Sequence, residues 1–128
     1  MADCDWAILC DYAFLDAGGK MCIIGIFERI YAQTVPAIHP QAVIVAKLRG
    51  APGEEVQLRV EIRRPNGLSL MRLDGTAKMS VEGGAGIQLR LAGLNLPDMG
   101  TYECSVYIEN EKSYVLPFQV GSPPSAVS

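Results

Sequence analysis

The 128-residue sequence contains few of the groups from which enzymes build active sites. It has one histidine, His39, and four cysteines without a C-x-x-C spacing. A Cys–His or Ser–His nucleophile would have to use His39, and the ligand spacing of a Cys/His metal site is absent. We therefore expect a non-enzymatic protein with no catalytic residue, no metal and no cofactor. A hydrolase-type enzyme that uses His39 or a carboxylate pair is the weakest alternative.

Concentrated charge and long apolar runs are also lacking. The net charge is −3, and the Lys and Arg residues are scattered. A nucleic-acid partner would require a basic stripe or patch, so none is expected. No run approaches the roughly 18 apolar residues of a membrane span. The segment Met1–Trp6 has two acids and no basic region typical of a signal peptide. These features predict a cytoplasmic protein without a membrane partner.

Cysteines are sparse for a protein that depends on disulfides. They stand at positions 4, 10, 22 and 104. A chain of this length buries about two-thirds of its unfolded surface and can fold without covalent cross-links. In a reducing cytoplasm we expect four free thiols, with a bridge between Cys22 and Cys104 as the alternative.

Strand-like alternation is abundant, and no helical period is evident. The clearest example covers residues 55–63, where apolar residues occupy every second position: Val56, Leu58, Val60 and Ile62. Residues 6–14 and 21–31 are apolar on both faces, and Thr34–Pro40 has two prolines and reads as a connection.

About eight strands with regular turn signals predict an all-β fold, an antiparallel two-sheet β-sandwich in one domain over residues 1–120. A closed barrel is the alternative. Residues 121–128 read as a flexible tail.

The stretch Leu96–Ile108 carries the most specific pattern. It begins with a turn and continues as an alternating strand, with the spacing Asp98-x-Gly100-x-Tyr102-x-Cys104. This spacing resembles the D-x-G-x-Y-x-C signature of immunoglobulin strand F, which implies an immunoglobulin-like fold and a structural corner at these four residues. We expect the Tyr102 hydroxyl to hydrogen-bond to backbone within residues 96–100, and Asp98 to close the turn. The sequence departs from an antibody domain because its only tryptophan, Trp6, precedes Cys22.

The first third carries a second pattern. It reads Leu9-Cys10-Asp11-Tyr12-Ala13, then Asp16 with Gly19-Lys20, then Ile23–Ile30 and Pro36-Ala37-Ile38-His39-Pro40. This pattern resembles an uncharacterised family of short bacterial proteins over nearly the whole chain. The resemblance implies a family membership and no activity, cofactor or site.

The apolar faces of the first two strands suggest a function. If residues 6–14 and 21–31 pair as a hairpin, one face fills the core and the other leaves an apolar patch on a monomer. We expect Leu9, Ile23 and Phe27 to form a candidate interface, unless residues 33–40 or the tail cover it. The sequence thus predicts a module for protein–protein interaction, with a protein partner or self-association. A structural subunit of a homo-oligomer or larger particle is the alternative.

Overall fold

A computed structural model describes residues 2–123 of the chain, and within them it contains nine β-strands and no helix. The prediction of an all-β protein is confirmed. Consistently, the described residues hold no helix that could cross a membrane. The strands are β1 (Asp3–Leu15), β2 (Met21–Phe27), β3 (Arg29–Tyr31), β4 (Ala37–Arg49), β5 (Glu55–Arg63), β6 (Ser69–Lys78), β7 (Gly84–Leu96), β8 (Gly100–Ile108) and β9 (Glu111–Gly121).

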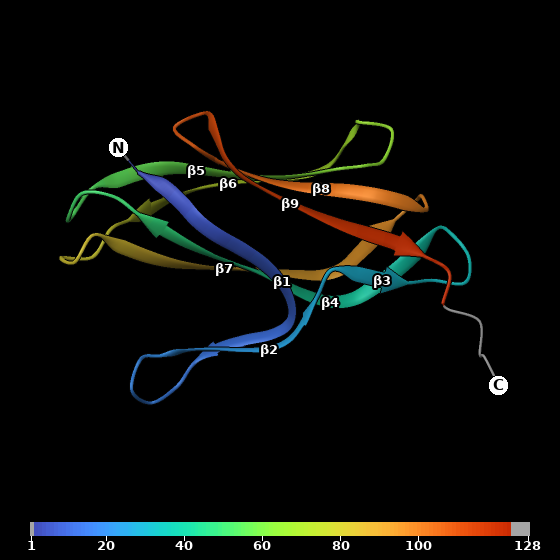
Figure 1. Cartoon of the computed structure of the whole chain (residues 1–128), viewed down its shortest axis with the longest axis horizontal. Coiled ribbons are helices and arrows are strands. Elements are labelled where there is room, and N and C mark those ends of the chain that lie inside the picture. Colours follow the sequence, from blue (N-terminus) through green and yellow to red (C-terminus); the bar gives the residue numbers. More distant parts are fainter. Residues whose placement is uncertain (1, 124–128) are drawn as a thin grey trace.

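The strands form two separate sheets rather than one closed ladder (Figure 1). Sheet A has the order β2-β1-β4-β7, and sheet B has the order β3-β9-β8-β5-β6. Every pair of neighbours is antiparallel except β3 and β9, which run parallel. The predicted two-sheet arrangement is therefore present, with this one departure from antiparallel pairing.

A shared apolar core lies between the two sheets. The alternating residues of 56–62 are buried, as are Tyr102, Cys104, Val106 and Ile108 of β8. The ring of Tyr102 stacks on Phe118 of β9, with 5.2 Å between the ring centroids. Sheet A contributes Leu9, Ile44 and Leu96 from three different strands. The period-2 patterns of β5 and β8 thus have the faces that the sequence predicts, because only one side of sheet B meets the core.

Three boundaries differ from the sequence interpretation. Residues 21–31 form two strands in different sheets, because the chain leaves sheet A after Phe27 and joins β9 from Arg29. The expected connection Thr34–Pro40 is shorter, since β4 begins at Ala37 and pairs with β7 from its first residue. Strand β6 also continues through Asp74 and Gly75, which pair with β5.

The C-terminal boundary and the state of the cysteines can also be compared with the sequence predictions. Strand β9 extends to Gly121, one residue into the expected tail, and residues 124–128 of that tail lie outside the described residues. All four cysteines are free. Cys104 lies in the core, whereas Cys22 is partly exposed on β2, so these two thiols do not form the alternative bridge.

Candidate interaction surface on the β1–β2 hairpin

Strands β1 and β2 form a hairpin that extends beyond the rest of sheet A. Strand β1 pairs with β4 only as far as Cys10, and from Leu9 onward it pairs with β2. Figure 1 shows the resulting bend, after which the hairpin runs below β4 and β7. The residues beyond the bend therefore have one face toward the outer side of sheet A and one face toward solvent.

The inner face of the hairpin packs on sheet A in a second apolar cluster, separate from the main core. We call it the hairpin cluster: Cys10, Ala13, Val43 and Val45, all of them buried. Met21 and Ile23 of β2 pack against it. The Arg90 guanidinium on β7 donates a hydrogen bond to the carbonyl oxygen of Ala13 (3.3 Å), which ties the hairpin to the far edge of the sheet. Val43 and Val45 point outward from sheet A, so they would be exposed without the hairpin.

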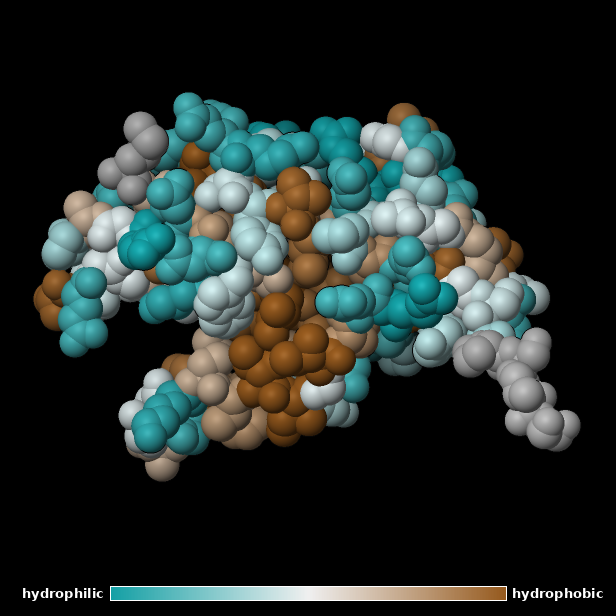
Figure 2. Space-filling model, in the orientation of Figure 1, coloured by the Kyte–Doolittle hydropathy of each residue, from teal (hydrophilic) through white to brown (hydrophobic). Residues whose placement is uncertain are grey.

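The outer face of the hairpin is apolar and exposed. The register places Tyr12 opposite Ile24 and Phe14 opposite Cys22, so these side chains share one face. Tyr12, Ile24 and Ile26 are 53%, 52% and 62% exposed. Figure 2 shows the corresponding hydrophobic area over β1 and β2, below a largely polar surface. We call this area the hairpin patch; it consists of Tyr12, Phe14, Leu15, Ile24 and Ile26.

The structure divides the three residues of the sequence-based interface among different environments. Leu9 is only 2% exposed and belongs to the main core, so it offers no surface to a partner. Ile23 packs against the hairpin cluster, and Phe27 packs against the main core. Of the three, only Ile23 therefore lies on the inner face of the hairpin. Four of the five patch residues lie on the opposite face of the hairpin, and Leu15 stands at the end of β1.

Strand β2 is also a free edge of sheet A. Its seven residues, Met21–Phe27, include no charged side chain and no proline. Gly25 adopts φ +74°, and a Cβ at this position would collide with the Asp11 carboxylate. Glycine is therefore required at position 25, where β2 passes the Asp11 side chain of β1. Charged residues and prolines commonly guard edge strands, and β2 has neither.

A groove continues from the hairpin patch. It has a volume of about 790 Å³ and runs between the β2–β3 segment and β9. Its lining includes Ile26 of the patch, Tyr31 of β3 and Val115 of β9, all of which are exposed. Arg29 in the same groove donates to the side-chain oxygen of Gln119 (2.6 Å). The patch and the groove therefore adjoin at Ile26.

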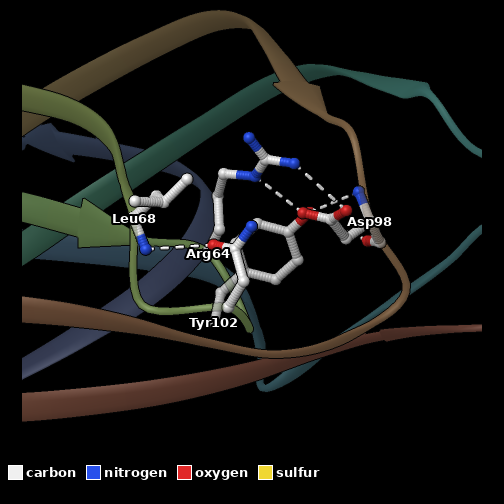
Figure 3. A network of polar contacts seen from close by, with 5 residues as sticks. Arg64, Leu68, Asp98 and Tyr102 are labelled. Atoms are coloured by element: carbon white, nitrogen blue, oxygen red, sulfur yellow. Dashed lines mark hydrogen bonds and ion pairs between the residues drawn. The ribbon is translucent and has the colours of Figure 1, made fainter.

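The corner before β8 is a structural site (Figure 3). The Tyr102 hydroxyl donates to the carbonyl oxygen of Asp98 (2.8 Å) and accepts from its N–H (2.9 Å), the hydrogen bond expected from the spacing. The Asp98 carboxylate does not close the turn onto backbone; it pairs with Arg64 through two hydrogen bonds, of 2.7 and 3.2 Å. This pairing lowers the pKa of Asp98 below its usual range. Sequence reasoning missed Arg64, which lies 34 positions away.

Gly100 and Cys104 complete this corner. Gly100 has φ +122° and faces the ring of Pro65, so a Cβ there would be strained. Cys104 is fully buried in the core, and burial raises its pKa to about 12. A thiol of this kind is not a nucleophile near neutral pH, because only the thiolate reacts. The four residues of the corner therefore hold the fold.

The remaining candidates for chemistry lie apart from one another. His39 is in β4 rather than in a loop, and its ring contacts Phe27 at 5.3 Å between centroids. Among residues 2–123, no three His, Cys, Asp or Glu side chains are grouped in a way that could hold a metal ion. The Asp5 carboxylate is paired with Arg49 (2.9 Å). Tyr107 is covered by the guanidinium of Arg59, 4.2 Å from the ring centroid.

Comparison with known proteins identifies the family of the chain. Residues 5–121, which include all the strands from β2 to β9, match the model of a family of unknown function (DUF6941). The chain belongs to this family, so the predicted membership in an uncharacterised family is confirmed. No curated protein matches the chain.

Proposed function

We propose that this protein is a non-enzymatic interaction module that contacts a protein partner through the hairpin patch and the free edge of β2. The observation that carries this proposal is the exposure of large apolar side chains on both strands of one hairpin. If a large side chain offers about 200 Å² when fully exposed, the five patch residues present about 500 Å². Contiguous apolar patches of this size on monomers are often functional.

The edge adds a second means of binding. A free strand presents N–H and C=O groups that can pair with a strand of another chain. The polar groups of such a pairing supply affinity, and the side chains on either face supply specificity. On β2 the free backbone groups and the apolar side chains lie on the same strand. Ile24 and Ile26 of the patch belong to β2, whose outer side has no partner strand.

We also infer an immunoglobulin-like arrangement for the two sheets. The position of β8 between β5 and β9 supports it, as does the tyrosine corner at the start of β8. The absence of a Trp between Cys22 and β5 separates the chain from antibody domains. Sandwiches of this kind bind through their loops, faces or edges, which agrees with an interaction role.

A bacterial origin and a cytoplasmic location are part of the same proposal. The sequence pattern of the first third supports the former. The exposed, unpaired thiol of Cys22 supports the latter, because thiols remain reduced in that compartment. Alkylation of freshly lysed cells followed by mass spectrometry tests the location, and quantitative oxidation of Cys22 contradicts it.

Site-specific photo-crosslinking in the producing cell tests the interaction itself. A photoreactive phenylalanine analogue is placed at Ile24, at Ile26 or, as the matched control, at Leu68. Leu68 is 60% exposed, close to the 62% of Ile26, but lies in the β5–β6 turn away from the hairpin. We expect defined protein adducts from positions 24 and 26 and none from position 68.

Two outcomes contradict the proposal. Adducts of equal yield at all three positions would show only random encounters. The absence of adducts at positions 24 and 26 would show that the patch has no partner in the cell. In either case the circular dichroism spectrum of each variant confirms that the fold is intact.

A further inference from the structure

We propose that the partner at the β2 edge is a second copy of this chain, with the two β2 strands antiparallel across a twofold axis centred on Ile24. The proposal rests on the proposed function, because it names the partner of the same surface. Its basis is the distribution of charge along the edge. Twofold dimers with self-complementary contacts are the commonest homo-oligomers.

The charges next to β2 complement one another in one register only. Lys20 precedes the strand and Glu28 follows it, and no residue between them is charged. When Ile24 faces Ile24 of the second copy, Lys20 of each copy lies opposite Glu28 of the other. A shift of two residues places both charges opposite apolar residues or beyond the strand. The sequence therefore specifies both the antiparallel direction and the register of the pairing.

Both charged residues are available for this contact. Lys20 and Glu28 are exposed, and neither forms an ion pair with another residue of the described chain. The backbone at this point is held in place, because the carbonyl oxygen of Glu28 accepts a hydrogen bond from the N–H of Gln119 (3.0 Å). The backbone that carries Glu28 is thus fixed at the end of the strand.

The apolar residues of β2 fit the same register. Cys22 lies opposite Ile26 of the second copy, and Met21 lies opposite Phe27. Cross-strand neighbours have Cβ atoms roughly 5 Å apart, so these side chains contact one another and cover the open flank of the edge. The hairpin patches of the two copies then join on one face of a sheet that continues through both molecules.

An edge strand of the other sheet shows what a guarded strand contains. Strand β6 is the outer strand of sheet B and carries Arg72, Asp74 and Lys78. Arg72 and Asp74 already pair with each other at 3.0 Å. Charges within a strand disfavour pairing with another chain. On β2 the charges lie outside the strand and complement their own copies.

Charge reversal in the purified protein tests this inference. The dissociation constant of the dimer is measured by sedimentation equilibrium over a wide concentration range. Lys20→Glu or Glu28→Lys alone places like charges together at both ends of the pair, and we expect each to raise the dissociation constant about tenfold. The double variant Lys20→Glu/Glu28→Lys restores opposite charges, and we expect it to return to within about threefold of the wild type.

A second pair of variants tests the apolar part. Ile26→Lys puts a charge on the edge itself, and we expect it to abolish the dimer at concentrations at which the wild type is fully dimeric. Leu68→Lys makes the same change at equal exposure elsewhere and should leave the dimer unaffected. A dimer that tolerates Ile26→Lys, or a double charge variant no better than the single ones, overturns the inference.

The failure of this inference can be distinguished from failure of the proposed function. A wild type that remains monomeric up to millimolar concentration, together with cellular crosslinks from Ile24 to a different protein, rejects the second copy and retains the module. A monomer without any crosslink from position 24 or 26 rejects both.

Discussion

The main core and the hairpin cluster both bury apolar side chains, but they differ in the number and size of those side chains. The main core joins both sheets and includes the large side chains of Tyr102, Phe118 and Leu96. The hairpin cluster consists of one cysteine, one alanine and two valines. Because the stabilisation from burial scales with the apolar area removed from water, the hairpin is held to sheet A by a small part of the total. Part of the molecule can therefore open while the rest stays folded.

The two regions also differ in how they use polar groups. The main core is closed at one end by the Tyr102 hydroxyl, which makes two hydrogen bonds with Asp98, and by the bidentate pair of Asp98 with Arg64. The side chains of Arg90 and Gln41 hold the hairpin through longer hydrogen bonds, to the carbonyl oxygens of Ala13 (3.3 Å) and Asp11 (3.4 Å). The proposed contact surface thus lies on the less firmly held region. Binding elements are commonly found in regions of lower local stability.

The largest expected effect concerns the main core. Leu58→Ala leaves a cavity between the sheets and should lower the free energy of unfolding by about 2–5 kcal/mol. Gln57→Ala, one position along the same strand, changes an exposed side chain and should be nearly silent. Chemical denaturation measures both. Equal losses at the two positions would contradict the assigned faces of β5.

A smaller, local effect is expected in the hairpin cluster. Val45→Ala removes two buried methyl groups beneath the hairpin and should weaken its attachment by about 1.5 kcal/mol. Amide hydrogen exchange in residues 12–26 should then accelerate by about tenfold, whereas residues 102–108 should be little affected. Val81→Ala, at a highly exposed position, serves as the control. Equal acceleration in both regions would mean that the hairpin opens only with the whole molecule.

The reactivity of the four cysteines measures the difference in local stability between the hairpin and the main core without any mutation. Cys22 is partly exposed, Cys10 lies in the hairpin cluster, and Cys4 and Cys104 lie in the main core. In the native protein at pH 8 we expect a thiol reagent to label Cys22 first, Cys10 next through opening of the hairpin, and the other two last. Peptide mapping gives the order. Labelling of Cys10 and Cys104 at one common rate would contradict separate opening.

The pH dependence of this labelling follows from the thiol pKa values. Burial raises the pKa of Cys4 to about 11 and that of Cys104 to about 12, whereas both titrate near 9 in the unfolded chain. The folded state therefore keeps these protons when the unfolded state loses them. Their contribution to stability is complete below about pH 9 and is lost as the pH rises toward 12. Labelling of both thiols should accelerate over that range through unfolding.

The sequence predicted the features that depend on local spacing. The faces of β5 and β8 follow from the alternation at Leu58 and Tyr102, because a strand with one buried side shows a period of two. The hydrogen bond between Tyr102 and Asp98 was predictable because only four positions separate the partners. The family pattern in the first third was equally local.

Features that depend on distant pairing were not predictable. Residues 21–31 read as one strand, since nothing at Glu28 indicates that the next residues join the other sheet. The exposed face of the hairpin was misassigned because β1 bends where its pairing with β4 ends, so that Cys10 and Ala13 both become buried. Arg64 carries no local sign of its pairing with Asp98. In each case the partner lies far away in the sequence.

The parallel pairing of β3 with β9 has a consequence for the order of folding. Arg29 and Gln119, which meet in this ladder, are 90 residues apart in the chain. The β1–β2 hairpin joins neighbouring segments and can form early, whereas sheet B is completed only when the last strand is present. During synthesis, which proceeds from the N-terminus, the hairpin ends at Phe27 and is therefore made long before β9, which begins at Glu111. The face that later covers Val43 and Val45 is exposed until β4 is made, whereas the hairpin patch is exposed throughout that interval.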